Sequence, residues 1–86
     1  MLKKKENMER LYLREMSSKY KDNWIVAVNC HYDGSGLSDV IGDVYLVTTN
    51  KDEAYSVKKQ LNNENIYEEI TVFEGHKTIG RIGSVY

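Results

Sequence analysis

The chain has 86 residues and a net charge of −1, and 41% of its residues are hydrophobic and 29% charged. This length allows one domain with one small core, and no apolar run approaches the roughly 20 residues of a membrane-spanning helix. A single cysteine excludes an internal disulfide, and the basic start Met1–Lys5 is not followed by the apolar stretch of a signal peptide. We therefore expect one cytoplasmic domain over residues 1–86, with an N-terminal basic segment at 1–23 and a sheet plus helix at 24–86.

The first predicted element is a helix from Glu6 to Tyr20, because this segment is rich in helix formers and contains no glycine. Its apolar residues recur every fourth position and form one stripe. The stripe consists of Met8, Tyr12, Met16 and Tyr20, with Leu13 beside them. We expect it to pack on the sheet of the same chain, and a partner-binding helix is the alternative.

Two strands follow, at Trp24–Tyr32 and Val40–Thr48, since both segments are dense in β-branched and aromatic residues. The short connection, with the turn residues Asp33–Gly36, predicts that they pair antiparallel. Strict alternation divides the first strand between two faces. One face carries Trp24, Val26, Val28, Cys30 and Tyr32, and the other carries Ile25, Ala27, Asn29 and His31.

A second helix is predicted over residues 50–63, where Asn50 can cap the first turn and Glu53 completes a capping-box pair. Ala54, Val57 and Leu61 mark its buried stripe. The pattern then predicts a third strand at Ile66–Glu74, a turn at Gly75–His76 and a weak fourth strand at Lys77–Tyr86. The predicted fold is α+β in the order α-β-β-α-β-β, a small antiparallel sheet of three to four strands packed with two helices.

The segment VNCHYDGSGLSD, Val28–Asp39, concentrates residue types that are common in active sites. Cys30 and His31 are adjacent and point to opposite faces of a strand, so only His76 could serve a Cys30 nucleophile as base. One cysteine and two histidines do not make a four-ligand zinc set. The glycines lack the spacing and following helix of a phosphate loop, and the aspartates lack the spacing of an EF-hand. We interpret the segment as a strand and its turn, and we expect no catalytic activity, cofactor or metal.

Acidity and tyrosine content point instead to a binding surface. Residues 24–76 carry three lysines and nine acids, a net charge of −6, and the chain has seven tyrosines. Exposed tyrosines beside carboxylates suit a basic partner surface, although strands also favour tyrosine and an acidic surface also aids solubility. The residues expected on this surface are Tyr32, Asp33, Asp39, Asp43, Tyr45, Glu68 and Glu69.

A small nucleic-acid-binding regulator is the alternative. Residues 1–23 carry seven Lys/Arg and four acids, a net charge of +3, and nearby tyrosines could stack on bases. The basic residues are Lys3, Lys4, Lys5, Arg10, Arg14, Lys19 and Lys21. Because acids are interleaved with them, we do not favour direct binding of nucleic acid, and we expect no membrane-surface helix.

The run DVYLVTTNKDEAYSVKKQLNNENIYEEITVFE, Asp43–Glu74, resembles a layout found in small phage and mobile-element proteins, and the likeness spans about residues 24–74. In that layout a hairpin strand leads into a Thr/Asn-Lys-Asp/Glu-Glu-Ala helix and then a short acidic strand. Such proteins include anti-CRISPR and other anti-defence inhibitors that bind a host nuclease without performing chemistry. The resemblance implies a non-enzymatic inhibitor or regulator of a nucleic-acid-handling protein in the host cytoplasm. It transfers no site residue, because it lies in the layout alone.

Self-association as a two-fold dimer is the remaining expectation. Apolar residues fall on both faces of the predicted sheet, and both helices could pack on the same face. The other face would then need a second chain. The residues concerned are Trp24, Val26 and Val28 on one face, and Ile25, Tyr45, Val47 and Phe73 on the other. In the alternative, the N-terminal helix crosses the second face and the monomer is self-sufficient.

Overall fold

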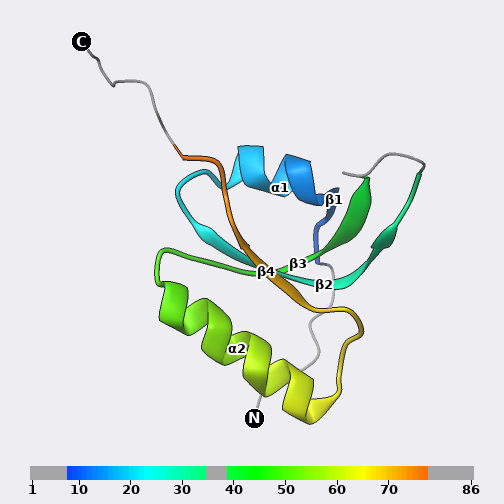
Figure 1. The fold of residues 1–86 in the computed structure, drawn as a ribbon, viewed down its shortest axis with the longest axis vertical. Helices are drawn as coiled ribbons and strands as arrows, with labels where there is room; N and C mark the ends of the chain where they lie inside the picture. The colour runs from blue at the N-terminus through cyan, green and yellow to red at the C-terminus, as the bar shows by residue number, and fades with distance from the viewer. Residues whose placement is uncertain (1–7, 35–38, 78–86) are drawn as a thin grey trace.

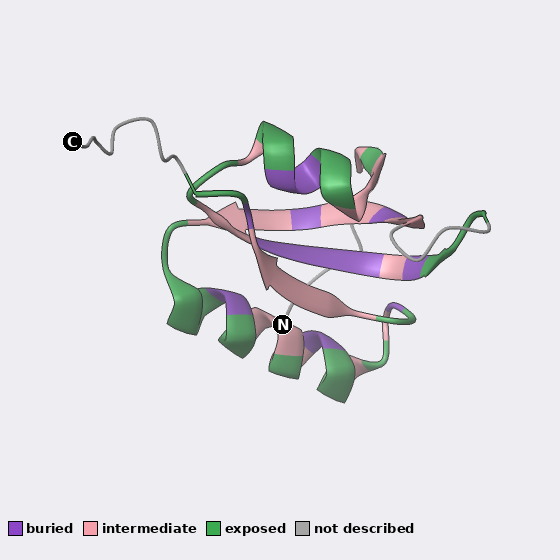
Figure 2. Ribbon diagram, turned by 45° about the horizontal axis from the view of Figure 1, so that its top comes forward, coloured by how far each residue is buried: buried purple, intermediate pink, exposed green. Residues whose placement is uncertain are grey.

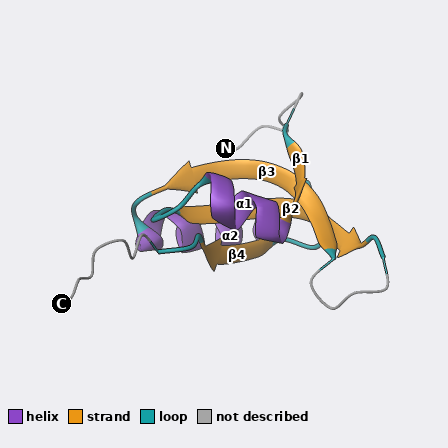
Figure 3. Cartoon of the chain, turned by 90° about the horizontal axis from the view of Figure 1, so that it is seen from above, coloured by secondary structure: helices purple, strands orange, loops and turns teal. Residues whose placement is uncertain are grey.

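The computed structural model describes residues 8–34 and 39–77, which form four strands and two helices. The elements are β1 (Arg10–Tyr12), α1 (Leu13–Lys19), β2 (Trp24–Tyr32), β3 (Val40–Thr48), α2 (Lys51–Glu64) and β4 (Thr71–Glu74). The strands make one antiparallel sheet in the order β1-β3-β2-β4. Figure 3 shows this twisted sheet from above, with β1 and β4 at its edges. The α+β class, the antiparallel sheet and the two helices are confirmed.

The chain enters the sheet before its first helix, which differs from the predicted order. Arg10–Tyr12 pairs with β3, so α1 begins at Leu13 rather than at Glu6. The side chain of Glu15 accepts a 3.0 Å hydrogen bond from the Tyr12 amide at the start of the helix. The predicted single stripe is therefore divided between the two faces of the sheet. Met8 packs against the core on the α2 side, whereas Met16 of α1 lies in the core on the opposite face. The predicted fourth strand at Lys77–Tyr86 lies, beyond Lys77, outside the described residues.

The two helices cover opposite faces of the sheet (Figure 1). The central strand β2 lies between them and is buried along most of its length (Figure 2). The core on the α2 side comprises Val26, Val28, Tyr45, Ala54, Leu61 and Tyr67. The core on the α1 side comprises Met16, Ile25, Ala27 and Cys30. Both apolar faces are thus covered within one chain, and the premise that led to the dimer prediction does not hold. Within the described ranges, no helix has the length and apolar character needed to cross a membrane.

Two irregularities in the β2–β3 pairing change which residues share a face. Asn29 has a φ of 56°, and β2 gains one residue relative to β3 between Val28 and His31. Cys30 consequently packs with Ile25 and Ala27 under α1, so its predicted place on the Trp24 face was wrong. A second shift between Val26 and Ala27 adds a residue to β3. Because of this extra residue, the side chain of Tyr45 points into the core on the α2 side.

Helix α2 forms where the local sequence predicts it. The Asn50 side chain accepts a 3.2 Å hydrogen bond from the Glu53 amide, and Asn65 ends the helix in the left-handed conformation with a φ of 55°. The predicted strand at Ile66–Glu74 is shorter in the structure, because β4 begins only at Thr71. The preceding loop includes Glu69 with a φ of 44°, which lies outside the extended region that a regular strand requires.

Gly75 and His76 do not form the predicted turn but continue the run of β4 past the start of β2. The Gly75 amide donates to the Asn23 carbonyl at 2.8 Å, and His76 exchanges hydrogen bonds of 2.9–3.0 Å with Asp22 and Ser17. A Cβ at Gly75 would overlap the carbonyl oxygen of Tyr20. Glycine is therefore required here by the close approach of two backbones.

Candidate functional site

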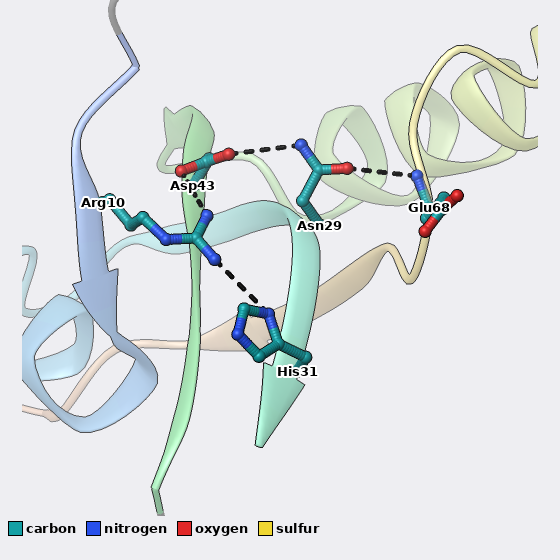
Figure 4. A network of polar contacts seen from close by, with 5 residues as sticks. All are labelled: Arg10, Asn29, His31, Asp43 and Glu68. Carbon is teal, nitrogen blue, oxygen red and sulfur yellow. Dashed lines mark hydrogen bonds and ion pairs between the residues drawn. The ribbon is translucent and has the colours of Figure 1, made fainter. Parts of the chain in front are cut away.

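The irregular turn of β2 at Asn29 holds the loop between α2 and β4 (Figure 4). The Asn29 amide donates to the Glu68 carbonyl at 2.7 Å, and its side-chain oxygen accepts from the Glu68 amide at 3.3 Å. The Cys30 amide donates to the Glu69 carbonyl at 3.2 Å. These bonds place the exposed side chains of Glu68 and Glu69 beside the second half of β2.

Asp43 connects this turn to the edge strand β1 (Figure 4). One of its oxygens lies 2.9 Å from Nη1 of Arg10, and the other accepts a 3.2 Å hydrogen bond from the Asn29 side chain. Nη2 of Arg10 lies 3.3 Å from Nδ1 of His31, and since a guanidinium only donates, Nδ1 is the acceptor. Both carboxylate oxygens of Asp43 are thus occupied within the chain.

The segment β1–α1 also holds both ends of the connection between β2 and β3. The Tyr12 hydroxyl donates to Asp33 at 2.5 Å, and Arg14 forms an ion pair with Asp39 at 2.6 Å. The hydrogen bond to Asp33 raises the pKa of Tyr12. The guanidinium of Arg14 also lies 4.8 Å from the centre of the Tyr12 ring. This cation–π contact helps to hold Tyr12 against Asp33 and Arg14 against Asp39.

The seven predicted surface residues have different environments in the structure. Tyr45 is only 6% exposed and packs edge-on against Tyr67 with ring centroids 5.6 Å apart, so its prediction as a surface residue was wrong. Asp39 and Asp43 lie in ion pairs with arginines of the N-terminal segment. The remaining four are exposed at one end of the sheet: Tyr32, Asp33, Glu68 and Glu69.

Two of these four residues, Tyr32 and Glu69, line a shallow depression of about 450 Å³. It is lined by Cys30, His31, Tyr32, Val40, Glu69 and Thr71. Tyr32 is 63% exposed, whereas the Cys30 thiol is nearly covered and burial raises its pKa. A raised pKa disfavours the thiolate, which is the nucleophilic form of cysteine.

The Cys30–His76 pair does not come together. His76 bonds to Ser17 and Asp22 beside the start of β2, while Cys30 lies near the end of the same strand. The six-residue separation from Trp24 to Cys30 spans about 20 Å along a strand. Among residues 8–34 and 39–77, no group of three or more His, Cys, Asp or Glu side chains could hold a metal ion.

The oppositely charged sequence segments form ion pairs with each other at the surface of the molecule. Arg10 and Arg14 pair with Asp43 and Asp39, and Lys19 pairs with Glu9 within the N-terminal segment itself. The basic and acidic segments were predicted to form two separate binding surfaces. Their opposite net charges were the signal that could have indicated docking of one on the other.

The ion pair between Lys19 and Glu9 predicts a contribution to acid sensitivity. The hydrogen bond from Lys19, followed by that from Tyr20, lowers the pKa of Glu9 below its ordinary value of 4.5. A lowered carboxyl pKa stabilises the fold above pH 4.5, and this contribution is lost as the pH falls through the lowered value. Urea unfolding should therefore show Glu9→Gln less stable than wild type at neutral pH, with the difference in unfolding free energy narrowing as the pH falls below 4.5. The difference in unfolding free energy between Lys19→Gln and wild type should narrow over the same pH range. A difference that stays constant as the pH falls would contradict the role of this ion pair in lowering the pKa of Glu9.

Comparisons of the chain with protein-family models, with curated proteins and with solved structures found no match.

Proposed function

We propose that this protein is a non-enzymatic binding protein, an inhibitor or regulator that covers a basic surface of a host protein that handles nucleic acid. The observation that carries the proposal is the position of Tyr32, which is 63% exposed at the end of β2. Asp33 follows it, and the bonds of Asn29 and Cys30 hold Glu68 and Glu69 alongside. A tyrosine offers a large rigid contact area, and the surrounding carboxylates steer a basic partner toward it.

Among the described residues, no strand pairs with the backbone of Tyr32 on the side away from β3. β4 pairs only with Trp24–Ala27, and the loop before it reaches only Asn29 and Cys30. The Asp33 amide donates toward β3, to the Asp39 carbonyl at 2.8 Å. Because hydrogen-bonding groups alternate along an antiparallel strand, the amide and carbonyl of Tyr32 point away from β3. An extended segment of a partner can reach them there.

Charge supports a basic partner at this end of the sheet. Neither Glu68 nor Glu69 forms an ion pair with any other residue that the structure describes, so both carboxylates face solvent. The alternative, a nucleic-acid-binding regulator that uses the N-terminal helix, has less support. Arg10, Arg14 and Lys19 are already engaged by carboxylates. The layout resemblance to phage anti-defence proteins points to the same class of partner.

Affinity capture from a host lysate tests the proposal with a matched pair of variants. Tyr32→Ala should reduce recovery of the partner about 30-fold, which corresponds to the loss of one interface hot spot. The double variant Glu68→Lys/Glu69→Lys should slow association. Tyr55→Ala is the control, because Tyr55 is also exposed, at 45%, but lies on α2 near the opposite end of β2.

Two results would contradict the proposal. One is that the folded wild-type chain captures no protein. The other is that the Tyr32→Ala and Tyr55→Ala variants capture the same proteins in the same amounts.

A further inference from the structure

Among the residues that the structure describes, the lysines without an ion pair are concentrated on α2. Among the described residues, Arg10, Arg14, Lys19 and Lys77 each pair with a carboxylate. The four other cations in these ranges form no ion pair with a described residue, and they are Lys21, Lys51, Lys58 and Lys59. Three of these four belong to one helix of 14 residues.

Charge is divided between the two flanks of that helix. At 3.6 residues per turn, Lys51, Tyr55 and Lys58 fall within about 60° of one another around the helix axis, and Lys59 lies next to them. The opposite flank carries Glu53, Gln60 and Glu64, and the buried side between the flanks carries Ala54 and Leu61. Asp52 lies at the outward edge of the lysine flank. Three lysines and one aspartate leave this flank a net charge of +2.

An aromatic pair lies on the lysine flank. The rings of Trp24 and Tyr55 are 6.0 Å apart at an angle of 57°, and Nζ of Lys51 lies 5.5 Å from the centre of the Trp24 ring. Tyr55 is 45% exposed and Trp24 is half-buried. Lys51 and Lys59 are each four residues from Tyr55, so their Cα atoms lie about 6 Å along the helix axis on either side of that of Tyr55.

We infer that this flank of α2, together with Trp24, binds single-stranded nucleic acid. A ring with an open face takes an unpaired base by stacking, and cations on both sides of it take the neighbouring phosphates. A duplex offers no free base face to Tyr55. The surface lies at the start of β2, whereas Tyr32 and its carboxylates lie at the end of that strand. The inference is therefore independent of the proposed protein-binding surface.

The position of Trp24 provides a direct test, because it is the only tryptophan in the chain. Titration of the full chain with a 20-nucleotide oligodeoxythymidine at low salt should quench its fluorescence to saturation. The affinity should fall steeply as salt is added, since the lysines release counterions. Tyr55→Ala should weaken binding about fivefold to a hundredfold, and Lys59→Glu should weaken it and make the salt dependence shallower.

Matched controls separate this surface from general electrostatics and from the proposed function. Lys21→Glu makes the same charge change at an exposed lysine outside α2, and Tyr32→Ala removes the other exposed tyrosine. Neither should change the affinity more than twofold. No saturable quenching at low salt would overturn the inference, and so would equal losses in Lys21→Glu and Lys59→Glu. Displacement of the oligonucleotide by an equal charge of polyglutamate would also overturn it, because the surface would then accept acidic proteins.

Discussion

Replacing Met16 by aspartate is expected to detach α1 from the sheet and to make the protein self-associate. Met16 is fully buried and packs against Ile25, Ala27 and Cys30, so a carboxylate there loses its hydration without gaining a partner. The milder change Met16→Ala should cost about 2–5 kcal/mol of unfolding free energy. Without α1, the face that carries Ile25 and Phe73 becomes an exposed apolar patch of the kind that soluble monomers rarely retain.

Light scattering at micromolar concentration measures this outcome. The wild-type chain should have a mass near 10.0 kDa, and Met16→Asp should form larger species while circular dichroism still reports helix. If Met16→Asp unfolds completely, the mass of Met16→Ala is compared with that of wild type instead, since this variant should only weaken the packing of α1 on the sheet. Ser18→Asp is the control, because Ser18 is exposed on the same helix and should leave the mass unchanged. A wild-type mass of twice this value would show that the two helices do not suffice to cover the sheet.

The elements that the sequence predicted correctly are those specified by local signals. The strands Trp24–Tyr32 and Val40–Thr48 have the predicted bounds, since runs of β-branched and aromatic residues fit a half-buried pleated surface. Helix α2 differs from its prediction by one residue at each end, because Asn50 supplies a cap that needs no tertiary contact.

β1 could not be predicted, because its three residues become a strand only by pairing with β3. Arg10, Leu11 and Tyr12 lie opposite Asp43, Gly42 and Ile41, about 30 positions away in sequence. By intrinsic propensity alone, Arg10, Leu11 and Tyr12 are compatible with a helix, and they follow a run of helix-forming residues. The prediction of a single helix from Glu6 therefore failed where a tertiary contact overrode local propensity.

The faces of the first part of β2 were assigned correctly, but Cys30 and Tyr45 were assigned to the wrong faces, because alternation assumes a regular ladder. One residue with positive φ, Asn29, reverses the inward and outward directions for the rest of β2. Asparagine tolerates this conformation better than most residues, so an asparagine within the apolar run Trp24–Tyr32 was the available signal. The same irregularity brings Glu68 and Glu69 to β2, so the candidate surface depends on a feature that periodicity does not contain.

Shortening Leu61 to alanine is expected to give the largest loss of stability on the α2 side. Leu61 is fully buried in the core with Val26, Val28 and Tyr67, and its removal leaves a cavity that a helix anchored at both ends cannot close. Urea unfolding should show a loss of about 2–5 kcal/mol, a large part of the stability of a small domain. Asn62→Ala, an exposed change at the next position, should stay within about 0.5 kcal/mol of wild type.

The same substitution should also weaken the proposed protein contact while the chain remains folded. The Leu61 carbonyl accepts a 3.0 Å hydrogen bond from the Asn65 amide, and Tyr67 packs in the Leu61 core, so both ends of the turn that leads to Glu68 depend on this region. Capture of the partner by Leu61→Ala should therefore fall more than its folded fraction does, whereas capture by Leu61→Met should stay near the wild-type level, since the core volume is kept. Equal stability of Leu61→Ala and Asn62→Ala would mean that α2 does not pack on the sheet. Undiminished capture by a folded Leu61→Ala would mean that the loop of Glu68 and Glu69 is held by Asn29 alone.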